Sequence, residues 1–273
     1  MVKPIHPMSF LKCAQRKLCL VMSLLMFWTQ AAFAQTGAST AAQAAQDARP
    51  LKQGIPATSE LAGGQSHSYR ITLDAGQYLN VVVEQRGIDV VVALFGPDGK
   101  QIAEFDAEFR QQGQERVSQV AEAPGSYRLN VQAKQKEASA GSYEIRVTEL
   151  RAATEKDRAL QEARKLIVEM IRLYRAGKYG EARPLAERAL EIREKSLGPE
   201  HIEVAAALNN IAAIYSAQGD YAQAEPLYQR VLTIREKALG PEHPDVARSL
   251  NNLANLNYNK VIMRRWRRCI NAH

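Results

Sequence analysis

Two Glu-His pairs and four aspartates are the side chains whose types could support metal chemistry. Glu200-His201 recurs as Glu242-His243, 42 residues later. Because the pair repeats with a fixed period between predicted helices, a structural role is favoured over metal binding. The aspartates lie near predicted turns: Asp74, Asp89, Asp98 and Asp106. They lack the dense Asp-x-Asp spacing of a calcium loop, which leaves calcium as the weaker alternative.

Catalytic groupings are missing from the sequence as well. No serine, cysteine or histidine stands in a pattern that places a nucleophile beside a base. The stretch "GPDGK" at 96–100 lacks the glycine spacing and the following helix of a phosphate loop, and it is typical of a hairpin turn. We therefore predict a protein that is not an enzyme, with no catalytic residue, no cofactor and no metal.

Residues 59–148 show the alternation of strands that bury one face. Tyr69, Ile71 and Leu73 alternate with polar residues, and later segments repeat the pattern. The apolar run "DVVVALF" at 89–95 fits a strand inside a packed sheet. Turn signals separate these segments. The pattern predicts an antiparallel, jelly-roll-like β-sandwich over residues 56–150.

This segment resembles the bacterial pre-peptidase C-terminal domain, a small accessory module. The resemblance covers about a third of the chain and rests on "GQSHSYRITLDAGQYLNVVV", "APGSYRLNV" and "AGSYEIRV". The paired Gly-Ser-Tyr strand openings and the Gly-Pro-Asp-Gly hairpin fall where that module has them. The resemblance implies an accessory role without catalysis.

After residue 151 the hydrophobic period changes to that of helices. Two stretches align without a gap, 42 residues apart: "GKYGEARPLAERALEIREKSLGPEH" from Gly177 and "GDYAQAEPLYQRVLTIREKALGPEH" from Gly219. "LNNIAAIYSAQ" from Leu208 matches "LNNLANLNYNK" from Leu250 at the same offset. A fixed period of this size is typical of stacked helix pairs, so we predict an α-α solenoid over residues 151–260.

The repeats resemble tetratricopeptide repeats, in the 42-residue variant found in kinesin light chains. The resemblance implies that the first helix of each pair lines a concave groove that binds a protein or peptide partner. An asparagine there can hold an extended peptide, because its amide both donates and accepts hydrogen bonds. Carried over by position, the groove candidates are Asn209, Asn210, Ser216, Asn251, Asn252 and Asn255. The alternative for each asparagine is a capping or solvent-facing role.

The first repeat departs from this pattern. Glu169 stands where the second repeat has Ile211. The difference predicts that the first helix is a shifted, solvent-facing cap.

The net charge of +7 comes from the two ends of the chain. Residues 1–34 and 260–273 carry basic residues and no acid, so the body is close to neutral and no nucleic-acid partner is expected. Basic residues before the apolar run Leu18–Trp28, then Ala32 and Ala34, predict a signal peptide over 1–34. The run is shorter than the ~20 residues of a membrane span. We expect export to the periplasm or beyond, with no stable membrane span after cleavage, and a disordered leader over 35–55.

The tail at 261–273 does not continue the repeat. The offset predicts a stretch like "GDYAQAEPLYQR" from residue 261, whereas the chain reads "VIMRRWRRCINA". Restoring one G before the Val261 codon permits "GDYAEVEALYQR" in the shifted frame. We therefore predict that 261–273 is an out-of-frame reading of the next repeat, and that its arginines are not a binding site.

Together these patterns predict an exported scaffold that binds a peptide or protein partner in the groove of its helical repeats. One alternative is the truncated regulatory front of a caspase-like (CHAT) peptidase, since proteins with this domain order often continue into such a domain. A second alternative is a surface or carbohydrate-binding module that acts through the sandwich.

Overall fold

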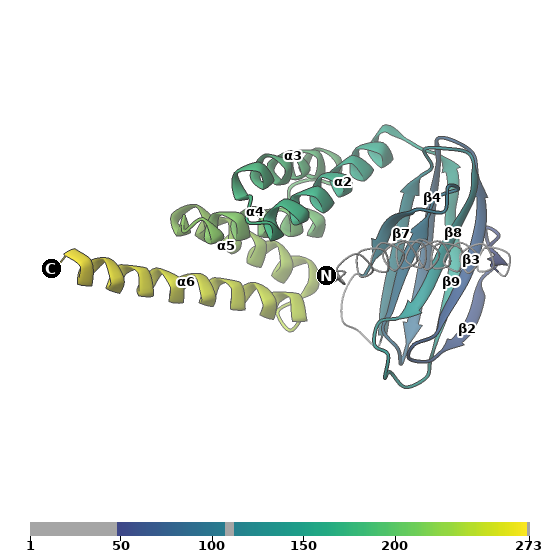
Figure 1. The fold of residues 1–273 in the computed structure, drawn as a ribbon, viewed down its shortest axis with the longest axis horizontal. Helices are drawn as coiled ribbons and strands as arrows, with labels where there is room; N and C mark the ends of the chain where they lie inside the picture. Colours follow the sequence, from purple (N-terminus) through teal and green to yellow (C-terminus); the bar gives the residue numbers. More distant parts are fainter. Residues whose placement is uncertain (1–47, 107–111, 272–273) are drawn as a thin grey trace, which may run out of the picture. The chain divides into compact units, whose positions relative to one another are not determined.

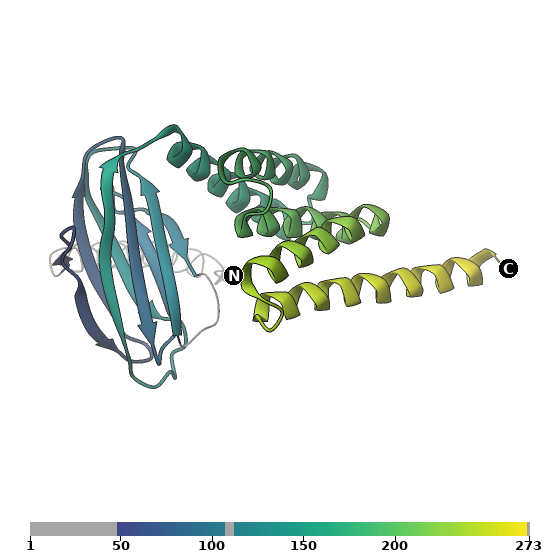
Figure 2. The same cartoon turned by 180° about the vertical axis from the view of Figure 1, so that it is seen from behind.

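The computed structural model describes residues 48–106 and 112–271. They form two compact units that divide between Leu150 and Arg151. The first is built of strands and the second of helices (Figures 1 and 2). The predicted fold class, a β-sandwich followed by an α-α solenoid, is confirmed. The predicted signal peptide over 1–34 lies outside the described residues.

The strands of the first unit pack as two sheets. Their bounds are β1 Arg49–Pro50, β2 Ala57–Leu61, β3 Ser66–Leu73, β4 Gln77–Arg86, β5 Val90–Phe95, β6 Gln101–Phe105, β7 Gln112–Val120, β8 Gly125–Ala133 and β9 Gly141–Ala152. One sheet has the order β1-β3-β8-β5-β6 and the other β2-β9-β4-β7. The pairs β3–β8, β5–β8, β5–β6, β4–β7 and β2–β9 are antiparallel, whereas β1 pairs with β3 in parallel.

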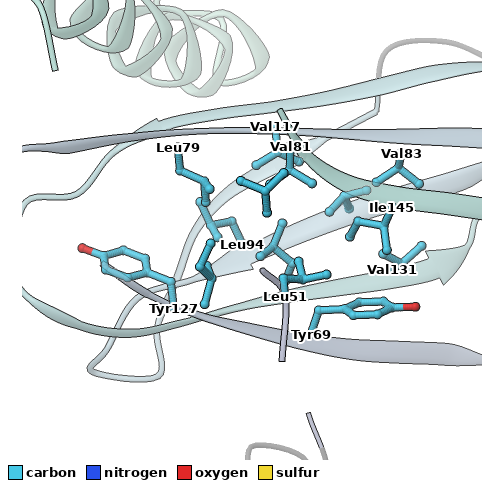
Figure 3. Close-up of a cluster of buried hydrophobic side chains, with 14 of the residues drawn as sticks. Leu51, Tyr69, Leu79, Val81, Val83, Leu94, Val117, Tyr127, Val131 and Ile145 are labelled. Atoms are coloured by element: carbon cyan, nitrogen blue, oxygen red, sulfur yellow. The ribbon is translucent and has the colours of Figure 1, made fainter. Parts of the chain in front are cut away.

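The inward faces of both sheets form a single hydrophobic core (Figure 3). Leu79, Val81 and Val83 alternate along β4 and are completely buried. The apolar run in β5 is buried on both faces, as its lack of alternation predicted, and β5 lies inside its sheet between β8 and β6. Tyr127 closes one corner, where its hydroxyl donates to the carbonyl of Ala123 at 2.8 Å.

Ordered structure begins before the predicted boundary at residue 56. Residues 48–55 were expected to belong to a disordered leader, but Leu51 is only 6% exposed and packs in the sandwich core. Its N–H donates to the carbonyl of Arg70 at 2.8 Å, next to the parallel pairing of β1 with β3. One apolar side chain and a few backbone hydrogen bonds thus order a segment whose composition is otherwise polar. Residues 35–47 lie outside the described residues.

The second unit consists of helices that stack in sequence order. Their bounds are α2 Glu155–Arg175, α3 Tyr179–Leu197, α4 Ile202–Ala217, α5 Tyr221–Leu239 and α6 Pro244–Asn271. Each packs against its neighbour in the sequence: α2 on α3, α3 on α4, α4 on α5 and α5 on α6. No helix in the described ranges is both long and apolar enough to cross a membrane.

The packing repeats with the same 42-residue offset as the sequence. Ala163, Ala189 and Ile192 form a buried cluster between α2 and α3. The equivalent residues pack together between α4 and α5: Ala205, Val231 and Ile234. The prediction that the first helix is shifted is therefore wrong, because α2 keeps the common register.

Glu169 is solvent-facing for a different reason. Its equivalent Ile211 packs back on the preceding helix pair, in a cluster with Met170 and Ala186. No such pair precedes α2 in the described chain, so the side chain of Glu169 is 45% exposed and forms an ion pair with Arg172 at 2.5 Å. The first helix thus carries charge where later helices carry a packing residue.

The helix α6 runs past the point where the earlier first helices end (Figure 1). Gly177 and Gly219 follow α2 and α4 with φ of 74° and 79°, a conformation that favours glycine. Position 261, one period after Gly219, is a valine. With no glycine to end it, α6 continues to Asn271.

Candidate functional site

The repeated histidines are helix caps. The Nδ1 atom of His201 accepts the N–H of Glu203 at 3.2 Å, and that of His243 accepts the N–H of Asp245 at 3.1 Å. Both bonds satisfy donors at the first turn of a helix. Glu200 instead pairs with Lys237 at 2.8 Å. These groups therefore hold the repeats together.

The four aspartates do not gather into one site among the described residues. Asp98 accepts the N–H of Lys100 in the hairpin turn, and this hydrogen bond lowers the pKa of Asp98. Asp89 and Asp106 flank the ammonium of Lys134, at 3.9 Å and 2.8 Å. Lys134 thus supplies a positive charge between these two carboxylates. Within the described ranges, no three His, Cys, Asp or Glu side chains gather as a metal site would need.

The asparagines lie on α4 and α6, and one pair is in direct contact. Asn252 donates through Nδ2 to Oδ1 of Asn209 at 2.9 Å, which brings the matching sides of the two helices together. Asn251 and Asn255 are exposed on the same side of α6, whereas Asn210 is half-buried on α4. Ser216, near the end of α4, is also half-buried. We call this side of α2, α4 and α6 the asparagine face.

On α2 the asparagine face is apolar, which the sequence reasoning missed. Val168 and Ile171 are 69% and 37% exposed. They stand 42 residues before Asn210 and Ala213. Applying the repeat offset to the first helix would have found them, because equivalent positions in stacked repeats share a face. The face therefore combines an apolar part on α2 with an amide-rich part on α4 and α6.

A series of hydrogen-bonded polar side chains that runs from the surface into the sandwich was also missed. Arg49 donates to Oγ of Ser59 at 2.8 Å, Ser59 lies 3.3 Å from the hydroxyl of Tyr69, and the Tyr69 and Tyr143 hydroxyls are 2.8 Å apart. Nδ1 of His67 lies 2.8 Å from the Tyr143 hydroxyl. The tyrosines alternate like core residues, so their hydroxyl partners gave no sequence signal.

The pKa values of Tyr143 and His67 are both shifted in the direction that keeps these side chains neutral. Burial raises the pKa of Tyr143 far above its ordinary value. Burial, and then the charge of Arg49, lowers the pKa of His67. Near neutral pH both side chains are therefore uncharged hydrogen-bonding groups, and they link β2, β3 and β9 across the two sheets.

Two protein-family models match the chain. The tetratricopeptide repeat model matches residues 171–237 and 203–259, and the bacterial pre-peptidase C-terminal domain model matches residues 65–133. The chain thus combines a pre-peptidase C-terminal domain with tetratricopeptide repeats, as the sequence predicted. Repeats of this kind indicate a protein–protein interaction scaffold.

Solved structures resemble each unit separately. The pre-peptidase C-terminal domain of a Bacillus anthracis collagenase is 20% identical over 37% of this chain and 94% of that chain, with a TM-score of 0.32. A periplasmic inhibitor of g-type lysozyme from Aeromonas hydrophila is 16% identical over 37% of this chain and 96% of that chain, with a TM-score of 0.30. No curated protein matches.

For the helices, a similar structure is the putative kinesin light chain repeats of Podosopora anserina. The two chains are 27% identical over 39% of this chain and 50% of that chain, with a TM-score of 0.35. The match therefore spans half of the length of that protein.

Proposed function

We propose that the protein is an exported scaffold that binds an extended segment of a partner protein on the asparagine face, without catalysis. The observation that carries the proposal is the hydrogen bond between Asn252 and Asn209. This bond joins amide groups of successive repeats, which supports the proposal that one continuous peptide backbone binds along them.

The amides suit a ligand in extended conformation. An extended peptide presents one N–H and one C=O per residue, and an asparagine side chain can satisfy both. Asn251 and Asn255 are exposed, and the bond to Asn252 uses only part of the hydrogen-bonding capacity of Asn209. The face can therefore hold a peptide with little dependence on its side chains.

The apolar part of the face adds a preference. An apolar side chain of the ligand that covers Val168 and Ile171 would contribute about 25 cal/mol of binding free energy per Å² of apolar area buried. We expect preferred ligands to carry an apolar residue near the end that lies over α2.

The test begins with peptides selected from a random library on the full chain. The affinity of each is then measured by calorimetry for the wild-type protein and for the double variant Asn251→Ala, Asn255→Ala. We expect about a thirtyfold loss, since two hydrogen bonds are lost and each contributes about 1 kcal/mol. Val168→Asp should remove the preference for an apolar residue.

The matched control is Asn257→Ala, which removes an exposed asparagine on another side of α6. Its affinity for the same peptides should be unchanged. Equal binding by the wild-type protein and the double variant, with both folded, would reject the asparagine face as the site.

Export is proposed on the pattern of residues 1–34. The expected mature protein begins at Gln35, which intact-mass measurement of the exported material would reveal. Retention of the first 34 residues would contradict this part of the proposal.

A further inference from the structure

One side of α6 exposes apolar residues at helical spacing. Leu250 is 50% exposed and Val261 is 49% exposed. Ala247 and Ala254 are exposed on the same side. Steps of three, four and seven residues keep these side chains along one stripe of a helix. We call this stripe the α6 docking face.

The equivalent stripe on α4 is fully covered. Ala205, Leu208 and Ala212 stand 42 residues before Ala247, Leu250 and Ala254, and they are 0%, 1% and 0% exposed. Residues of α5 cover them: Ala205 and Leu208 pack in one cluster with Val231 and Ile234, and Ala212 packs in another with Ala224 and Tyr228. The second helix of a repeat therefore buries this stripe of its first helix.

The first repeat shows the same arrangement. Ala163 of α2 packs with Ala189 and Ile192 of α3. In α6 the residues toward α5 are buried, with Val246 and Leu256 each 1% exposed, so α6 is fully packed on that side. In the described chain, α6 is the first helix of a repeat and has no second helix over its docking face.

Charged residues near the docking face indicate which ion pairs a helix bound there would form. Glu194 of α3 pairs with Arg230 of α5 at 2.7 Å, and Glu200 pairs with Lys237 of α5 at 2.8 Å. One period later stand Glu236 and Glu242. Both are exposed, and neither has an ion-pair partner among the described residues. A following second helix would present an arginine and a lysine to them.

We propose that the α6 docking face binds an amphipathic helix of the same kind as α3 and α5. The occupant carries small and aromatic residues along one side, and an arginine and a lysine seven residues apart that pair with Glu236 and Glu242. In the folded chain, α3 and α5 are packed between two helices each, so a second copy has no such helix to offer without unfolding. The docking face borders the asparagine face, because Asn251 lies four residues after Ala247 and three residues before Ala254.

The test uses the full chain and a labelled synthetic peptide of residues 219–240, which has the required pattern. We expect saturable one-to-one binding by fluorescence anisotropy and a gain in helicity of the peptide. Reversing the peptide charges with Arg230→Glu and Lys237→Glu should weaken binding by at least about tenfold, because two attractive pairs become repulsive. The protein variant Glu236→Arg, Glu242→Lys should regain binding of the reversed peptide.

Two variants test the apolar stripe. Leu250→Asp should abolish binding, whereas Ile102→Asp, which changes an isoleucine that is 44% exposed in the sandwich, should not. Circular dichroism would establish that both variants are folded. Equal binding of the original and the reversed peptide would overturn the proposal. A dimer in light scattering that Leu250→Asp dissociates would overturn it too, since a second copy would then be the occupant.

Discussion

Arg193 and Arg235 occupy equivalent places on α3 and α5, and they are only 8% and 5% exposed. Each donates through Nη1 to a carbonyl in the first turn of the next helix, Glu203 at 3.0 Å and Asp245 at 3.2 Å. Arg235 also donates to the hydroxyl of Ser249 at 2.8 Å. A buried guanidinium thus ties each second helix to the following helix.

Arg235→Met should lower the free energy of unfolding of the helical unit by about 2 kcal/mol, because buried oxygens of Asp245 and Ser249 lose a charged donor. Urea denaturation followed by circular dichroism would measure the loss. Arg188→Met is the matched control, since its side chain is 54% exposed and its ion pair with Glu191 contributes at most about 0.5 kcal/mol. Equal losses in the two variants would contradict this account.

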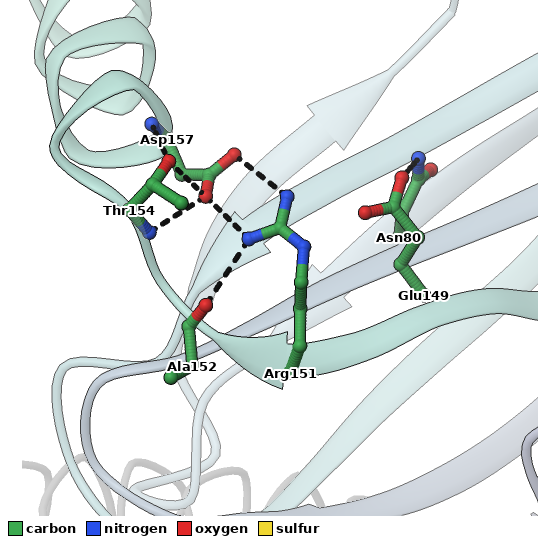
Figure 4. A network of polar contacts seen from close by, with 6 residues as sticks. All are labelled: Asn80, Glu149, Arg151, Ala152, Thr154 and Asp157. Atoms are coloured by element: carbon green, nitrogen blue, oxygen red, sulfur yellow. Dashed lines mark hydrogen bonds and ion pairs between the residues drawn. The ribbon is translucent and has the colours of Figure 1, made fainter.

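Asp157 controls the beginning of α2 (Figure 4). Its Oδ2 accepts from Arg151 at 2.6 Å and from the hydroxyl and N–H of Thr154 at 2.6 Å and 2.8 Å. Burial by itself raises the pKa of Asp157, but the hydrogen bonds from Arg151 and Thr154 outweigh it and lower the pKa to about 2. The folded state therefore prefers the ionised carboxylate.

This preference gives a pH dependence with a definite sign. The ordinary pKa of 3.8 applies to the unfolded chain, so the stabilisation is complete above about pH 4 and is lost as the pH falls toward 2. Asp157→Asn should reduce the loss of stability between pH 4 and pH 2 by about 1 kcal/mol. The expected change is this small because Arg151 is 40% exposed, and solvent screens its ion pair with Asp157. Urea titrations at several pH values would measure it. Glu155→Gln, at an exposed position, should leave the slope unchanged.

At the scale of elements, glycine decides where the first helices end. Gly219 has φ of 79°, and a Cβ added there would meet no other atom. Gly219→Ala should therefore lower the free energy of unfolding by about 1 kcal/mol, through backbone strain alone. Gly180 lies inside α3 with equally open space and no positive φ, so Gly180→Ala should stabilise by up to about 1 kcal/mol. Thermal unfolding should shift in opposite directions. A shift of the same sign in both variants would contradict the account.

Helices and strands could be predicted where the hydrophobic pattern of the sequence matches the side chains that are buried in the fold. Alternation predicted strands such as β3 and β4, and the 42-residue offset predicted α3, α4 and α5. β1 was missed because Arg49 and Pro50 have no alternation, and the buried apolar residues beside it are only Ala48 and Leu51. The asparagine positions were predictable from the repeat, but the contact between Asn209 and Asn252 was not, since it depends on how closely successive pairs stack.

At the scale of the molecule, the out-of-frame interpretation of residues 261–273 stays a prediction. The restored reading places a glycine at 261, where α2 and α4 are followed by Gly177 and Gly219. It also places an arginine at 272, one period after Arg230 and therefore opposite Glu236. Resequencing the gene across the Lys260 codon tests it: an extra G would support the prediction, and its absence would make the continuous α6 the native arrangement.

The peptidase and carbohydrate-binding alternatives likewise stay hypotheses.

The ion pair of Glu169 with Arg172 gives the helical unit two unlike ends. Stacking a helix pair on that side of α2 would remove two charged groups from water, which is costly without new partners. The α6 docking face, in contrast, is apolar and ready to be covered. The two ends of the unit are therefore not equivalent: in the proposal above the docking face accepts a helix, and the α2 end does not. Head-to-tail contacts that do not close generate filaments, and the charge at the α2 end disfavours growth of that kind through the helical unit.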